Sequence, residues 1–279
     1  MRVKYLCALV GMSKQNFYKE KRVRQRQAVD EALVLDLVRA ERHQQPRIGT
    51  RKLRLLIGQE LAEAGVSLGR DRLFGLLRRH DLLIARRRRS GPRTTDSRHG
   101  FRVYENLLKS AELKGPHEAW VSDLTYIRTR EGFLYLALVM DAWSRKIVGW
   151  HVGGTLEALG CLAAVRMAMA QLPTDAKPIH HSDRGTQYCC NDYVELLGSR
   201  KLPISMTEEN HCYENAKAER LNGILKEEYG LGEEFARKDE VERVVRQAVM
   251  LYNERRPHTA LGYRTPSSVH AQEPCRAAA

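Results

Sequence analysis

Three acidic residues, Asp123, Asp183 and Glu219, stand where their carboxylates could work together. Asp123 lies inside a predicted strand, 120–128, Asp183 directly follows a short predicted strand, and Glu219 lies within the predicted helix 216–229. An acid inside an otherwise apolar strand is costly unless it is satisfied, and a single one is best explained by a structural partner. Three acids that could converge on one sheet edge instead favour a metal-binding site. Oxygen ligands on rigid elements suit Mg²⁺ or Mn²⁺, so we expect divalent-metal chemistry.

Other reactive residues give weaker signals. The six cysteines contain no CxxC pair, which disfavours zinc and a disulfide framework and suits reduced thiols. His180 and His181 stand beside a strand end, where a structural role is expected. Asp141, at the end of the second predicted strand, is a fourth acid close in sequence to the site, and we predict that it pairs structurally with Arg145 rather than binding metal.

The elements that would position the three acids indicate a mixed α/β domain with helices packed on a central sheet. Turn signals and dense β-branched and aromatic runs predict three antiparallel strands in succession. Helices and short strands then alternate to the end of the chain. The predicted strands are 120–128, 133–141, 145–152, 178–183 and 203–206, and the predicted helices are 156–172, 192–199, 216–229 and 239–254.

The first half of the chain is helical. Short helices are predicted at 14–19 and 27–42, and Thr50 can cap a helix that ends at Ala64-Gly65. A second helix from about Gly69 to His80 completes a helix-turn-helix pattern typical of DNA-binding proteins. Its outer faces carry the basic residues Arg70, Arg72, Arg78 and Arg79. The alternative is a plain helical hairpin whose basic face is simply solvated.

Positive charge is concentrated in that half. The formal net charge is +13, but residues 1–115 contain 27 Lys and Arg against 12 Asp and Glu, whereas residues 116–279 contain 20 against 22. Such asymmetry indicates a nucleic-acid-binding region joined to another domain, although a solvated surface would look the same. We predict a DNA-binding region at 1–85, a basic linker at 86–115 and a catalytic domain at 116–279. Successive linker arginines could lie along a phosphate backbone, namely Arg86, Arg87, Arg88 and Arg89.

Spacing and local motifs carry a family resemblance. Thirty-five residues separate Asp183 from Glu219, and the three acids stand in WVSDLTYI, HSDRGTQY and NAKAERLNGILKEE. This resembles the D, D-35-E pattern of retroviral integrases and insertion-sequence transposases. The chain is most similar to the second-frame product of bacterial two-frame insertion elements. Further motifs shared with those proteins are the tail YNERRPHTALGYRTPSSV and the helix-turn-helix segment that begins RIGTRKLRLLIG.

The resemblance implies an RNase H-like fold of the retroviral integrase type, with a mixed five-stranded sheet. It implies a transposase that holds two Mg²⁺ ions per active site, with Mn²⁺ able to substitute and Asp123 as the shared ligand. Water would first cut at the element end, and the freed 3′-hydroxyl would then attack another strand, so joining needs no ATP. Lys226, two turns after Glu219, would contact DNA phosphate; the alternative is a lysine on a solvated helix face.

The implied partners are double-stranded DNA, further copies of the chain bound to that DNA, and a first-frame protein or fusion segment. No leucine-zipper segment precedes LCALVGMSKQNFYKE, so we expect weak recognition of element ends by this chain alone. No apolar run is long enough for a membrane helix, and a cytoplasmic location is the default. Two alternatives remain: a non-catalytic DNA-binding regulator, and a nuclease for RNA–DNA hybrids. The three acids argue against the first and the basic helical region against the second.

Overall fold

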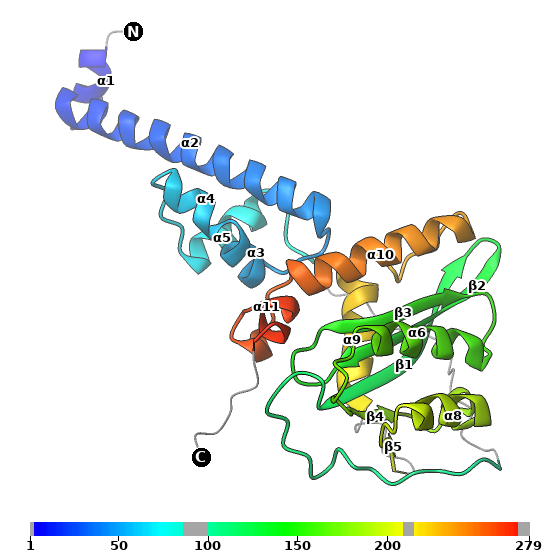
Figure 1. The fold of residues 1–279 in the computed structure, drawn as a ribbon. Coiled ribbons are helices and arrows are strands. Elements are labelled where there is room, and N and C mark those ends of the chain that lie inside the picture. Colours follow the sequence, from blue (N-terminus) through cyan, green and yellow to red (C-terminus); the bar gives the residue numbers. More distant parts are fainter. Residues whose placement is uncertain (1–2, 86–99, 209–214, 273–279) are drawn as a thin grey trace, which may run out of the picture. The chain divides into compact units, whose positions relative to one another are not determined.

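The computed structural model describes residues 3–85, 100–208 and 215–272, and the chain forms two compact units, residues 1–85 and 86–279 (Figure 1). The second unit contains the sheet and all three candidate acids. Within the described ranges, no helix is both long and apolar enough to span a membrane.

The sheet of the second unit has the mixed topology expected from the sequence. Across the described ranges it contains five strands in the order β3-β2-β1-β4-β5. The first three strands form the predicted antiparallel meander, and β4 and β5 then add in parallel beside β1. The strands are β1 (Ala119–Thr129), β2 (Gly132–Asp141), β3 (Ile147–Gly153), β4 (Ile179–Ser182) and β5 (Ile204–Met206).

Helices pack on both faces of this sheet (Figure 1), because alternate strand residues supply two separate cores. Val121 and Ile127 of β1 pack with α9 (Ala216–Glu228) and α10 (Lys238–Glu254). Trp120 of β1 lies in the other core, with α6 (Ala158–Ala170) and α8 (Asn191–Ser199). Asp123 belongs to the odd-numbered set of β1, which faces α9 and α10.

One glycine lets α6 approach the sheet closely. A Cβ added to Gly149 of β3 would collide with the backbone oxygen of Ala164 on α6. This backbone-to-backbone contact leaves no space for any larger residue at position 149.

The segment before β1 packs on the sheet rather than extending as a spacer. The Leu107 N–H donates to Ser205 Oγ at 2.9 Å, and the Met206 N–H is 3.4 Å from the Glu105 carbonyl. Tyr104 packs against one core, and Leu108 against the other. The predicted linker at 86–115 therefore differs from the structure in its part from Tyr104 to Leu113, which packs as part of the second unit.

The first unit is helical, as predicted, with its own apolar core. The described helices are α1 (Val3–Leu9), α2 (Lys14–Gln44), α3 (Thr50–Leu56), α4 (Gly58–Glu63) and α5 (Arg70–Arg79). The core residues come from the second half of α2 and from α3, α4 and α5, and include Val34, Val38, Ile48, Leu53 and Leu73.

Two predictions about helices were wrong in detail, and one short helix was missed. The two helices expected at 14–19 and 27–42 are one helix, α2, because no glycine or proline interrupts the polar residues between them. The single helix expected from Thr50 is divided at Ile57, which has φ −90° and ψ 2°. The short helix α7 (Thr186–Cys189) was not predicted.

Candidate active site

The register of two parallel strands brings Asp123 and Asp183 to the same place. β1 and β4 pair as Ala119 with Ile179 and Val121 with His181. Continuing that register by two residues puts Asp123 opposite Asp183, on the same face of the sheet, just beyond the end of the pairing. Asp183 therefore lies just past the carboxyl end of β4, beside Asp123 in the middle of β1.

Asp123 is a partly buried carboxylate with two hydrogen bonds. Its Oδ1 accepts from the Leu124 N–H at 2.9 Å, and its Oδ2 accepts from Asn222 Nδ2 at 2.7 Å. Burial and the nearby charges of Asp183 and Glu219 raise the pKa of Asp123 to about 7, against the lowering effect of these bonds. A carboxyl with this environment is half-protonated near neutral pH unless a cation binds beside it.

Asp183 is held by the turn that follows β4. Its Oδ1 accepts from the Gly185 N–H at 3.0 Å. A Cβ on Gly185 would lie only 3.0 Å from that oxygen and 2.8 Å from Gln187 Oε1. The backbone of Gly185 is extended, so the glycine provides space beside the carboxylate rather than a special turn. Gln187 donates to the Leu156 carbonyl at 2.9 Å, which fixes the loop.

Glu219 is exposed on the first turn of α9, one turn before Asn222. It contributes to the raised pKa of Asp123, so the two acids interact. Within the described ranges, no three Asp, Glu, His or Cys side chains are grouped closely enough to bind one ion together. The desolvated, mutually repelling oxygens of Asp123 and Asp183 are what a hard divalent cation would neutralise.

Asn222 contacts the candidate site, although the sequence patterns did not single it out. It is buried, and it is the side chain that touches Asp123 directly. Its position three residues after Glu219 in AERLN is the signal that could have found it, since residues three apart share a helix face. Asn215, one turn before Glu219, contacts a different group, because its Nδ2 donates to the Ser122 carbonyl at 3.1 Å and ties the start of α9 to β1.

The two histidines next to the site are structural, as expected. His180 is fully buried, with Nε2 2.8 Å from Ser122 Oγ and 3.0 Å from Tyr193 Oη. Burial lowers the pKa of His180 to about 3, so it stays neutral at physiological pH. His181 Nδ1 is 2.8 Å from Ser205 Oγ.

Asp141 is also structural, but its partners differ from the prediction. It is fully buried, and its carboxylate accepts from the His117 N–H at 2.8 Å and from the Ser144 N–H and hydroxyl at 2.7 and 2.8 Å. The bond recorded from Arg145 goes from its backbone N–H to the Asp141 carbonyl. The hydrogen bonds to the Asp141 carboxylate thus come from His117 and Ser144, while its charge acts on Arg145 by opposing the lowering of the Arg145 pKa by burial.

Lys226 lies on the helix that carries Glu219. Its Nζ is 4.0 Å from the centre of the Tyr126 ring on β1, a cation–π contact. The lysine is only partly buried, so its ammonium group is both positioned by Tyr126 and open to solvent.

The predicted DNA-contacting arginines of the first unit are all exposed on α5. Arg70 is paired with Asp71 and Arg79 with Glu31, each at 2.8 Å. The four arginines predicted to contact DNA from the linker, Arg86, Arg87, Arg88 and Arg89, lie outside the described residues.

Comparisons with known proteins agree with this architecture. Two family models, both described as integrase core domain, match residues 114–212 and 200–266. The chain is 35% identical to the insertion element IS600 uncharacterized 31 kDa protein of Shigella sonnei, over 94% of this chain and 96% of that protein. It is 31% identical to transposase InsF for insertion sequence IS3A of Escherichia coli, over 95% and 92%.

One solved structure extends the comparison to the fold. A chain of the simian T-cell lymphotropic virus intasome, solved in complex with a PP2A regulatory subunit, matches with a TM-score of 0.52 at 15% identity. The match covers 82% of this chain and 73% of that one. At this identity the likeness concerns the fold, which is RNase H-like. Together with the sequence matches, it shows that the chain belongs to the insertion-sequence transposases that carry an integrase core domain.

Proposed function

We propose that this transposase cuts phosphodiester bonds at the ends of a mobile DNA element and joins the freed 3′-hydroxyl to a second strand, using Asp123, Asp183 and Glu219 as its catalytic metal ligands. The observation that carries the proposal is the register of β1 and β4, which aligns Asp123 with Asp183 beside the helix of Glu219. A structural scaffold gains nothing from placing carboxylates where they repel one another.

Each residue has a separate task. Asp123, Asp183 and Glu219 would hold the metal ions, with Asp123 as the shared ligand. Mg²⁺, or Mn²⁺ in its place, would supply Lewis-acid activation of the attacking oxygen and stabilisation of the leaving oxygen. Asn222 orients the Asp123 carboxylate through its 2.7 Å hydrogen bond. Gly185 leaves the space that Asp183 needs.

DNA would be held by basic residues of both units. Lys226, positioned by Tyr126, is the proposed phosphate contact next to the carboxylates. In the first unit, the exposed residues of α5 would contact the duplex, namely Arg70, Arg72, Arg78 and Arg79, followed in sequence by Arg86, Arg87, Arg88 and Arg89. The working assembly would be a homo-oligomer on DNA, with a first-frame protein or segment as partner for end recognition.

The experiment is strand cleavage and joining on labelled duplexes that carry candidate element ends. The native chain is compared with Asp183→Asn and Glu219→Gln, in Mg²⁺, in Mn²⁺ and in EDTA. Asp192→Asn removes one exposed acid of α8 and is the matched control. We expect metal-dependent 3′-hydroxyl products from the native chain and the control, and none from the two site variants. Products that persist in Asp183→Asn would overturn the assignment. DNA binding without products, even with a first-frame partner added, would favour the regulator.

A further inference from the structure

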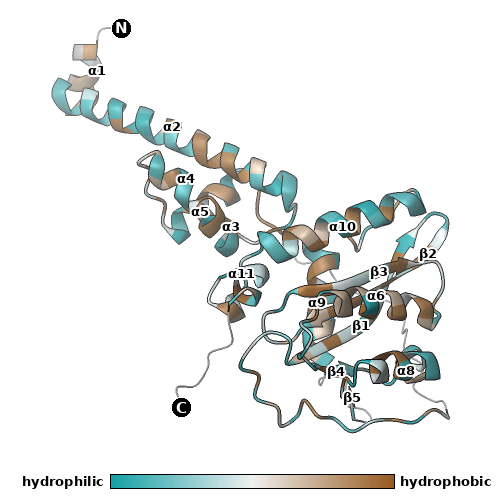
Figure 2. Ribbon diagram, viewed as in Figure 1, coloured by the Kyte–Doolittle hydropathy of each residue, from teal (hydrophilic) through white to brown (hydrophobic). Residues whose placement is uncertain are grey.

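The N-terminal half of α2 is a helix with nothing packed against most of its length. Every residue from Lys21 to Val29 is exposed, and the buried residues of the helix are Val34, Leu35, Val38 and Glu41, all in its second half. Figure 2 shows the same division, with hydrophilic colour over the first half and hydrophobic colour concentrated in the second. A half-helix without an apolar face has no means of docking on a protein core.

The charged side chains in the N-terminal half of α2 are mostly basic. Residues 14–26 contain six Lys and Arg and a single acid, Glu20. Glu20 is occupied by Arg24, whose guanidinium lies 3.3 Å away on the next turn. The other basic side chains of the segment have no ion pair recorded among the described residues.

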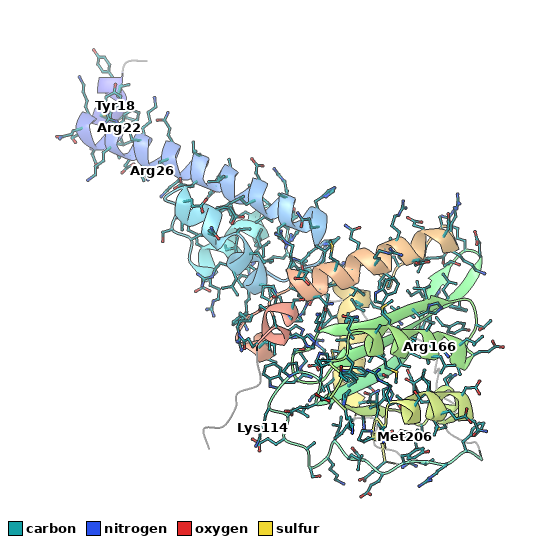
Figure 3. All side chains as sticks on the ribbon, in the orientation of Figure 1. Tyr18, Arg22, Arg26, Lys114, Arg166 and Met206 are labelled. Carbon is teal, nitrogen blue, oxygen red and sulfur yellow. The ribbon has the colours of Figure 1, made fainter. Side chains whose placement is uncertain are left out.

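Several of these residues fall on one helix face. Steps of four residues keep Lys14, Tyr18, Arg22 and Arg26 in one row, because each step turns the helix only about 40° beyond a full turn. Lys19 and Lys21 flank this row on its two sides, whereas Glu20 and Arg24 project from the opposite side of the helix. Figure 3 labels Tyr18, Arg22 and Arg26 following one another along this half of the helix. We call Lys14, Tyr18, Lys19, Arg22 and Arg26 the basic stripe.

We propose that the basic stripe is a further DNA-binding surface, separate from the arginines of α5, and that it binds the phosphate backbone of duplex DNA without reading sequence. From Lys14 to Arg26 the stripe spans about 18 Å along the helix. Duplex DNA presents one phosphate per roughly 3.4 Å of axis on each strand, so several cations can contact phosphates at once. The inference rests on DNA being the substrate, as argued under Proposed function.

Duplex DNA is favoured over other partners by the chemistry of the segment. A protein partner would need an apolar patch, and a membrane surface would need large apolar residues opposite the cations. The exposed half of α2 offers no continuous apolar patch, since its exposed apolar side chains, Tyr18, Val23 and Val29, stand apart among polar and basic residues. Tyr18, which is 48% exposed, adds a hydroxyl donor suited to phosphate oxygens.

The test compares two double variants of the full-length chain that remove the same charge from the same helix. Arg22→Gln with Arg26→Gln alters the stripe. Arg24→Gln with Arg39→Gln is the control, because both arginines already pair with helix neighbours, Glu20 and Asp36. Binding to a labelled 30-base-pair duplex of arbitrary sequence is followed by fluorescence anisotropy from 50 to 300 mM salt. Circular dichroism and thermal unfolding confirm that both variants are folded.

We expect the stripe variant to bind roughly tenfold more weakly near 0.1 M salt, and to reduce the slope of log K against log salt by about 2. The control should change affinity less than about threefold. A photo-crosslinking residue at position 18 should crosslink to the duplex, and the same residue at position 24 should not.

The proposal would be overturned if both variants lost the same amount of affinity for the duplex, or if neither lost any. A stripe variant that loses binding to phosphatidylserine vesicles but keeps its affinity for the duplex would also overturn it. Asp183→Asn should retain full duplex binding in this assay. A failure of the stripe and a failure of the catalytic assignment are therefore distinguishable, because the first affects binding and the second affects only bond cleavage.

Discussion

Two aspartates on neighbouring strands of one sheet, Asp123 on β1 and Asp141 at the end of β2, have opposite surroundings. Asp141 is fully buried, and backbone and hydroxyl donors from His117, Trp143 and Ser144 surround its oxygens. Asp123 is only partly buried and has two donors, yet like charges and burial raise its pKa to about 7. Asp141 is thus satisfied within the fold, whereas the charge of Asp123 is the one that a bound cation would stabilise.

The largest expected effect separates the two acids by activity. Asp123→Asn should reduce strand cleavage by about a thousandfold or more, since it removes the carboxylate shared between the two proposed ions. Ser144→Ala removes one donor to Asp141 and should leave the rate per folded molecule within about threefold of the native rate. Initial cleavage rates in Mg²⁺, normalised to folded protein, measure both. A comparable loss of rate in both variants would remove the distinction.

Substitution of Asp141 should lower the free energy of unfolding more than substitution of Asp123, the reverse of the order expected for the cleavage rate. Asp141→Asn replaces one carboxylate oxygen with an amide N–H₂ group, which would face the hydrogen-bond donors that contact the native carboxylate. The substitution should therefore lower the free energy of unfolding by about 2–4 kcal/mol. Asp123→Asn in metal-free protein should be neutral or stabilising at pH 8, because it removes a charge that burial and Asp183 disfavour. Urea unfolding of the two variants in EDTA provides the comparison. A more stable Asp141→Asn protein would contradict it.

Arg256→Ala tests a residue that stabilises the fold beside α9. The Arg256 guanidinium is buried and binds both Glu228 oxygens of α9, at 2.7 and 2.8 Å. Removing it leaves a largely buried carboxylate without this partner, at an expected cost of about 3 kcal/mol. The double variant Arg256→Met with Glu228→Gln should recover part of that loss. Thermal unfolding monitors both, and an unchanged midpoint in Arg256→Ala would refute the role.

Protons and metal ions should compete for the Asp123 carboxylate, which would distinguish it further from Asp141. The folded-state pKa of about 7 lies above the ordinary aspartate value, so the folded protein holds this proton more tightly than the unfolded chain does. The stabilisation from this group in metal-free protein is complete at acidic pH and is lost as pH rises from about 4 to 7. Mn²⁺ affinity should move the other way, weakening by up to about tenfold per unit as pH falls below 7. Calorimetry at pH 5.5–8 measures that slope, which should flatten in Asp123→Asn.

The smallest expected effect belongs to Asn222→Ala. Its amide hydrogen bond favours the ionised form of Asp123, so the pKa of Asp123 should rise further when the amide is removed. The midpoint of the Mn²⁺ affinity profile should then shift to higher pH, and cleavage at pH 7 should fall by about three- to tenfold. Recovery of the rate at pH 8.5 would support positioning through Asp123. A loss of equal size at both pH values would point to a purely structural role.

The sequence predicted most of the second unit because its signals are local. Alternating and dense apolar runs gave every strand, and the meander followed from short turns. It missed the short helix α7, and it assigned 101–115 to a linker because sparse apolar residues such as Tyr104 and Leu108 do not show a period. It also divided the long helix α2 into two, although nothing in residues 20–26 ends a helix.

The residue types and spacing of Asp123, Asp183 and Glu219 were visible in the sequence, as was the resemblance that connects them. Only the tertiary structure decided that the register of β1 with β4 aligns the two aspartates, that Asn222 supports the first of them, and that Asp141 is satisfied by backbone donors. The reason is physical. Local patterns fix helices and strands, whereas strand pairing, desolvation and the choice of a hydrogen-bond donor depend on residues that lie about 60 to 100 positions away in the chain.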